Sequence, residues 1–166
     1  MMESRSNLSV KYIADVPSMP STSRQDLLSA AQAFCNTFAE QKPPEEIFSH
    51  FSSANDVLAV EHGLPQLAPF LGREFRGQDG IREYFRLLSS NLKYENMHFS
   101  NFVVDAEVSK VSCRGEATFT WTSTGQGWDE VFTYVLEFDP DNKVKVYEIW
   151  ADSGAAYLAS KGELKQ

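Results

Sequence analysis

One glutamate lies on the apolar face of a segment with strand-like alternation. Every second residue from 128 to 138 is Trp128, Glu130, Phe132, Tyr134, Leu136 and Phe138. Alternate residues of a strand point to the same side, so Glu130 shares its face with aromatic side chains. If this face lines a cavity, the loss of solvent raises the pKa of the carboxyl group and makes it a general acid or base. A strand-end glutamate that reaches solvent or pairs with an arginine is the alternative.

Asp152 is a second candidate for proton transfer. The lysines at the start of the segment 143–150 indicate an outer face, which places Glu148, Trp150 and Asp152 on the inner one. Asp152 also precedes a predicted helical turn at 155–160, where an aspartate is typical of an N-cap. The two roles are compatible with each other.

His62 is the third candidate, because it ends a short apolar strand at 57–62. An imidazole near a pocket mouth moves protons at neutral pH, whereas a histidine hydrogen-bonded beside the core is the alternative. His98 shares a predicted face with Phe102 and is assigned to substrate binding. The other expected substrate contacts are aromatic: Trp150, Tyr134, Trp121, Phe119, Tyr84 and Phe85.

The elements that must position these residues divide into helices first and strands afterwards. Leu27, Ala31, Phe34 and Phe38 recur at helical spacing after the capping-box pattern of Ser23. Further helices are expected at 45–51 and 78–91, strands at 57–62, 94–105, 108–123, 128–138 and 143–150, and a buried crossing segment at 63–77. This order predicts an α+β fold with helices against one face of a curved antiparallel sheet.

Length and charge limit the function classes. The chain has 166 residues, enough for one domain, which we place at 23–166 after a flexible arm at 1–22. A net charge of −8 disfavours nucleic-acid binding, and no apolar run is long enough for a membrane span. Cys35 and Cys113 form no metal-ligand motif and are expected as free thiols in the cytoplasm, with no metal site.

Two motifs resemble a known family. The run Phe75-Arg76-Gly77-Gln78-Asp79-Gly80-Ile81-Arg82-Glu83-Tyr84-Phe85 is similar to the entry into the third helix of the SnoaL-like (polyketide cyclase) branch of the nuclear transport factor 2-like superfamily. The run Tyr147-Glu148-Ile149-Trp150-Ala151-Asp152 adds to the likeness. The chain also resembles fungal members of that group whose chemistry is not known.

The resemblance implies a cone-shaped fold with a pocket between sheet and helices, often with a homodimer through the outer face of the sheet. It implies acid/base chemistry without a metal or organic cofactor. SnoaL-like cyclases carry a catalytic aspartate near the end of the last strand, and Asp152 is the nearest match by position.

The function expected from these observations is that of an isomerase, cyclase or dehydratase acting without a cofactor. Its substrate would be a small apolar molecule, polycyclic ones included, bound in an aromatic-lined pocket. The alternative is a small-ligand-binding or dimeric scaffold protein of the same fold that catalyses no reaction.

Overall fold

Two of the four described helices begin at a side-chain cap. The computed structural model describes residues 22–165, so the expected arm at 1–22 lies outside it except for its last residue. Helix α1 (Arg24–Ala39) has the predicted capping box, with the Ser23 hydroxyl accepting from the Asp26 amide at 3.1 Å. The other helices are α2 (Pro44–Ser49), α3 (Gly77–Asn91) and α4 (Ser153–Lys161).

Six strands form one sheet in the order β2-β1-β6-β5-β4-β3. They are β1 (Leu58–His62), β2 (Glu74–Arg76), β3 (Leu92–Asp105), β4 (Lys110–Trp121), β5 (Gly127–Phe138) and β6 (Val144–Trp150). The sheet is mixed, because β1 and β6 are parallel while the other pairs are antiparallel. The segment at 63–77, which we expected to cross the core, contains the short edge strand β2 near its end.

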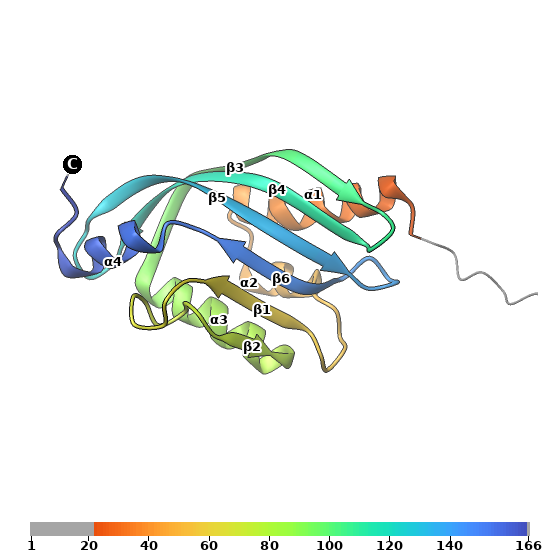
Figure 1. Ribbon diagram of the computed structural model, residues 1–166, viewed down its shortest axis with the longest axis horizontal. Coiled ribbons are helices and arrows are strands. Elements are labelled where there is room, and N and C mark those ends of the chain that lie inside the picture. Colours follow the sequence, from red (N-terminus) through yellow and green to blue (C-terminus); the bar gives the residue numbers. More distant parts are fainter. Residues whose placement is uncertain (1–21, 166) are drawn as a thin grey trace, which may run out of the picture.

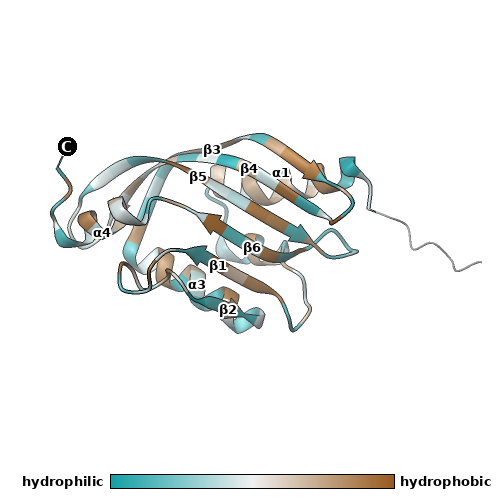
Figure 2. Cartoon of the chain, in the orientation of Figure 1, coloured by the Kyte–Doolittle hydropathy of each residue, from teal (hydrophilic) through white to brown (hydrophobic). Residues whose placement is uncertain are grey.

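Helices α1, α2 and α3 lie on the same side of the curved sheet, and α4 lies at one end of it (Figure 1). Hydrophobic and hydrophilic residues alternate along the central strands, as expected for a sheet with one covered face (Figure 2). The predicted α+β class, with a curved sheet packed against N-terminal helices, is therefore confirmed. The single parallel pair is the departure from the all-antiparallel sheet that we predicted.

Irregularities in two strands decide which side chains face the helices. The pairing of β3 with β4 shifts between Glu95 and His98 and again between Ser100 and Val103. The pairing of β5 with β6 shifts at the start of β6, beside Lys145. Each extra residue reverses the alternation beyond it.

The two cysteines meet in the core between α1 and β4. Their Sγ atoms are 3.7 Å apart, and both thiols are free and buried. Burial raises the pKa of the Cys35 thiol well above its ordinary value, so this thiol stays neutral. The pair contributes packing to the core.

Candidate active site

A cavity of about 840 Å³ lies between the inner face of the sheet and helices α1, α2 and α3. Its wall is mainly aromatic, and the rings that line it come from helices and strands alike: Phe38, Phe48, Phe70, Tyr84, Phe85, Tyr94, Phe119, Trp128, Phe132, Tyr134 and Tyr147. A cavity of this size, with many apolar atoms and few polar groups, is typical of a small-molecule site.

Glu61, on the inner face of β1, is the most perturbed carboxyl group in the cavity wall. Its side chain is 7% exposed, and its Oε2 accepts a hydrogen bond from the Tyr84 hydroxyl at 2.7 Å. Burial raises the pKa of Glu61 to about 7, against the opposing effect of the Tyr84 hydrogen bond and with a further rise from the charge of Glu130. Glu61 is thus able to gain and lose a proton near neutral pH.

Glu130, on β5, is the second carboxyl group of the cavity wall and is 8% exposed. Both of its oxygens accept hydrogen bonds: Oε2 from the Trp128 indole at 2.5 Å and Oε1 from the Asp152 amide at 2.7 Å. Burial raises the pKa of Glu130, while these two donors lower it. Glu61 and Glu130 therefore have different environments within one cavity, an arrangement that separates acid and base roles.

Three tyrosines meet beside Glu61. The ring centroid of Tyr147 is 4.9 Å from that of Tyr134 and 6.1 Å from that of Tyr84. Burial raises the pKa of all three hydroxyls well above the ordinary value. These hydroxyls remain protonated. Tyr84 donates its proton to Glu61 and Tyr147 donates to the Tyr134 oxygen, so Tyr134 is the tyrosine whose O–H can donate to an oxygen atom of a bound molecule.

The overall structure has many relatives among solved structures. No family model and no curated protein matches the sequence, but 254 solved chains match the structure, and several of them are described as nuclear transport factor 2-like proteins. The chain has the nuclear transport factor 2-like fold. This confirms the fold that the resemblance implied.

Three of the matching structures have a ligand or an activity in their own descriptions. TerC, co-crystallised with polyporic acid, has a TM-score of 0.67 and 18% identity over 82% of this chain and 98% of its own. The pinacolase BvnE from Penicillium brevicompactum has a TM-score of 0.61 and 18% identity over 84% and 94%. A proposed SnoaL-like polyketide cyclase from Mesorhizobium loti has a TM-score of 0.58 and 12% identity over 74% and 97%.

Within the nuclear transport factor 2-like fold, six of the ten predicted site residues line the cavity: Glu130, Asp152, Tyr84, Phe85, Phe119 and Tyr134. Asp152 is exposed, and its Oδ1 caps α4 by accepting from the Ala155 amide at 3.0 Å. The predicted N-cap is thus present, and the backbone amide of the same residue holds Glu130.

The other four predicted site residues, Trp150, His62, His98 and Trp121, lie outside the cavity wall. The expectation that Trp150 faces inward with Glu148 is wrong, because the bulge beside Lys145 turns Tyr147 and Ile149 inward instead. Trp150 is 44% exposed and stacks on the His62 ring at 4.2 Å.

His62 also faces away from the cavity, and its Nε2 pairs with Glu148 Oε1 at 3.1 Å. His62 shares its strand face with Leu58 and Val60, whereas Ala59 and Glu61 are the buried residues of this strand. Both faces of the strand hold apolar residues, so the alternation does not tell the inner face from the outer.

His98 and Trp121 are displaced from the cavity for different reasons. The bulge before His98 turns Met97 and Phe99 inward, and His98 pairs on the outer face with Glu116 at 2.7 Å. Trp121 is buried against Phe70 near the end of β4, beyond the cavity wall.

Two of the residues that the sequence reasoning missed are Glu61 and Tyr147. Glu61 lies on the same strand face as Val57 and Ala59. A charged residue on this otherwise apolar face was the sequence signal that could have identified it. Tyr147 was placed on the outer face, because only the bulge in β6 turns it inward.

Within residues 22–165, no helix is both long and apolar enough to cross a bilayer. The same residues contain no cluster of three or more His, Cys, Asp or Glu side chains that could hold a metal ion.

Proposed function

We propose that this protein is an enzyme that transfers a proton to or from a small apolar molecule in the aromatic cavity. The observation that carries the proposal is Glu61: a carboxyl group 7% exposed in an aromatic wall, with a pKa near 7. A group that titrates near the working pH is the most effective proton carrier. Isomerisation, cyclisation and dehydration all depend on such a transfer.

The contacts of Glu61 suggest how it would act. The Tyr84 hydroxyl fixes Oε2, and no other described residue donates a hydrogen bond to the carboxyl group. Oε1 of Glu61 would therefore receive the proton from a carbon atom held against the aromatic wall. The Tyr134 hydroxyl, which accepts a hydrogen bond from the Tyr147 hydroxyl, would stabilise negative charge that develops on a neighbouring oxygen.

The proposal also gives roles to Glu130 and Asp152, which carry the other carboxyl groups of the cavity wall. Glu130, hydrogen-bonded at both oxygens, would stabilise a positive charge that develops on the bound molecule. Asp152 would exchange protons with solvent at the cavity mouth, since it is exposed there and its second oxygen, Oδ2, is not used by the helix cap.

The second candidate function is the binding of a small ligand without catalysis. The hydrogen bonds to both Glu130 oxygens favour it, because such contacts also satisfy a purely structural carboxylate. In that case the wide cavity would retain a ligand, and neutralising the carboxyl groups would not prevent binding.

We also propose a homodimer through the outer face of the sheet. Val103, Val131 and Trp150 are 64%, 56% and 44% exposed on β3, β5 and β6, and pairing places them on the same face. Exposed apolar side chains on one sheet face are typical of a surface that a partner covers.

A general probe of proton abstraction tests the catalytic proposal without knowledge of the substrate. In 5-nitrobenzisoxazole, a base removes the ring C–H proton while the N–O bond breaks, which gives a coloured 2-cyano-4-nitrophenolate. We expect the protein to accelerate this reaction over free carboxylate, with a rate that rises with pH through about 7. Glu61→Gln should lower the rate by roughly 100-fold.

The matched control is Glu148→Gln, since Glu148 lies on the neighbouring strand but pairs with His62 on the outer face. This variant should keep the full rate. A Glu61→Gln rate equal to that of the unmodified protein would contradict the proposal and favour the ligand-binding function.

A further inference from the structure

Cationic side chains gather at the mouth of the cavity although the chain as a whole has a net charge of −8, and Asp152 is the exposed acidic side chain of the cavity wall. Four cationic side chains line the mouth: Lys42, Arg82, Arg86 and Lys93. Arg82 and Arg86 are four residues apart on α3 and lie on one stripe of the helix, and Lys93 follows as the second residue of β3. Lys42 approaches from the loop between α1 and α2.

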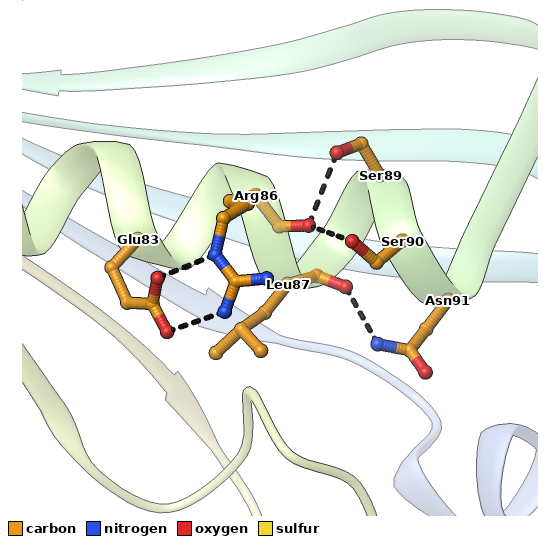
Figure 3. Close-up of polar contacts among 6 residues, drawn as sticks. All are labelled: Glu83, Arg86, Leu87, Ser89, Ser90 and Asn91. Atoms are coloured by element: carbon orange, nitrogen blue, oxygen red, sulfur yellow. Dashed lines mark hydrogen bonds and ion pairs between the residues drawn. The ribbon is translucent and has the colours of Figure 1, made fainter.

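Two of these cations are held in place by neighbouring groups. Glu83 accepts two hydrogen bonds from the Arg86 guanidinium group, at 2.7 and 2.8 Å, and Figure 3 shows this fork along α3. Arg82 donates to Glu45 at 3.2 Å and lies over the Phe48 ring. The fork uses two of the five N–H donors of Arg86 and leaves the others for a ligand.

Lys93 differs from the other three cations. Lys42 pairs with Glu40 at 3.1 Å, whereas Lys93 is exposed and no described residue forms an ion pair or hydrogen bond with its ammonium group. The mouth therefore keeps one lysine whose charge no carboxylate neutralises.

The interior of the cavity has the opposite character. Its only described ionisable groups other than tyrosines are Glu61 and Glu130, both buried. An anionic group placed beside them would meet negative charge in a low-dielectric site. A ligand with one anionic end can therefore enter in one orientation only, with its apolar body inside and its anion at the mouth.

We infer that the molecule bound here is an apolar, ring-containing compound with an anionic group such as a carboxylate, which Lys93 and Arg86 receive at the cavity mouth. This inference rests on the proposed function and names the substrate class for the same cavity. The anion fixes the orientation of the ligand and brings a carbon atom of the apolar body toward Glu61.

A matched pair of fluorescent probes tests the inference. 1-Pyrenebutyrate and 1-pyrenebutanol share the same apolar body and differ in their anionic or neutral end. We expect the folded protein to bind the butyrate roughly tenfold more tightly at low salt, with the difference shrinking as salt is added. Lys93→Gln and Arg86→Gln should each reduce this preference severalfold and leave the affinity for the alcohol unchanged.

The control variant is Lys110→Gln, because Lys110 is half-exposed on β4 and lies outside the cavity wall. It should keep the full preference for the butyrate. Equal affinities for the two probes would overturn the inference and leave the Glu61 assay unaffected. Failure of both probes to bind would overturn it together with the apolar cavity on which the proposed function depends.

Discussion

At the scale of single residues, the site depends on two carboxyl groups that differ in the number of their hydrogen-bond donors. Glu61 has a single hydrogen-bond donor, Tyr84, whereas Glu130 has two donors from different elements. Hydrogen bonds to a carboxylate favour its charged form, and burial favours its neutral form. Glu61 is therefore the group whose protonation changes near neutral pH.

The pH dependence of stability should report this burial. In the folded protein the pKa of Glu61 is raised from 4.5 to about 7, so between these values the folded state binds more protons than the unfolded state. Stability falls as pH rises through this window and is unaffected by Glu61 below it. The full loss corresponds to about 3 kcal/mol.

Urea unfolding at several pH values measures this contribution. Glu61→Gln, which removes the ionisable group, should lose much of the decline between pH 5 and 8. Glu148→Gln serves as the control and should keep it. An undiminished decline in Glu61→Gln would mean that other groups cause it.

Tyr84→Phe should move the titration of Glu61 in a known direction. The Tyr84 hydroxyl donates to Glu61 and lowers its pKa, so the loss of the hydroxyl raises that pKa further. The pH profile of the 5-nitrobenzisoxazole reaction should shift to higher pH. A profile that does not move, or that moves to lower pH, would contradict the role given to this hydrogen bond.

At the scale of elements, Asp152 connects α4 with the first residues of β5. Its side chain caps α4, while its backbone amide donates to Glu130. The side chain of Asp152 thus fixes the start of α4, and its backbone amide fixes the Glu130 carboxyl group. Substitutions of the Asp152 side chain can therefore distinguish its role as a helix cap from a role in catalysis.

Two substitutions of Asp152 should have different effects on stability. Asp152→Ala removes the cap and should lower the free energy of unfolding by about 1 kcal/mol, whereas asparagine is an equally good N-cap. Asp152→Asn should therefore remain as stable as the unmodified protein, as measured by urea unfolding. A lower rate in Asp152→Asn with unchanged stability would support its role as a proton carrier; an unchanged rate would leave Asp152 as a cap alone.

The elements were largely predictable from the sequence, whereas the facing of some side chains was not. Caps and spacing are local signals, so α1 and α3 were predicted within a few residues. Glu130 lies on a strand without irregularity between Gly127 and Glu137, so alternation gave its face correctly. The bulges in β3 and β6 depend on pairing with other strands and have no local sequence signal. Alternation alone therefore assigned His98 and Trp150 to the wrong face.

At the scale of the whole molecule, the two faces of the sheet have separate proposed roles. The inner face lines the cavity, and the outer face exposes apolar side chains near its centre. A dimer through the outer face would leave the cavity mouth beside α3 free for a ligand.

Substitution on the outer face tests this dimer. Val131→Lys replaces an exposed apolar side chain on the outer face of β5 with a charge and should convert a dimer into a monomer, as measured by light scattering coupled to gel filtration. Leu64→Lys is the matched control, since Leu64 is 58% exposed in a loop after β1. A monomeric unmodified protein would contradict the dimer directly, as would a Val131→Lys variant that remains dimeric.

The central claim is that Glu61 exchanges its proton near neutral pH inside an apolar cavity. Carbon-13 NMR of glutamate side chains tests it most directly, by following each carboxyl resonance from pH 3 to 9. We predict one resonance that titrates with a pKa of about 7 and is absent from Glu61→Gln. Titration of every glutamate between about pH 3 and 5, as in exposed carboxyl groups, would contradict the account.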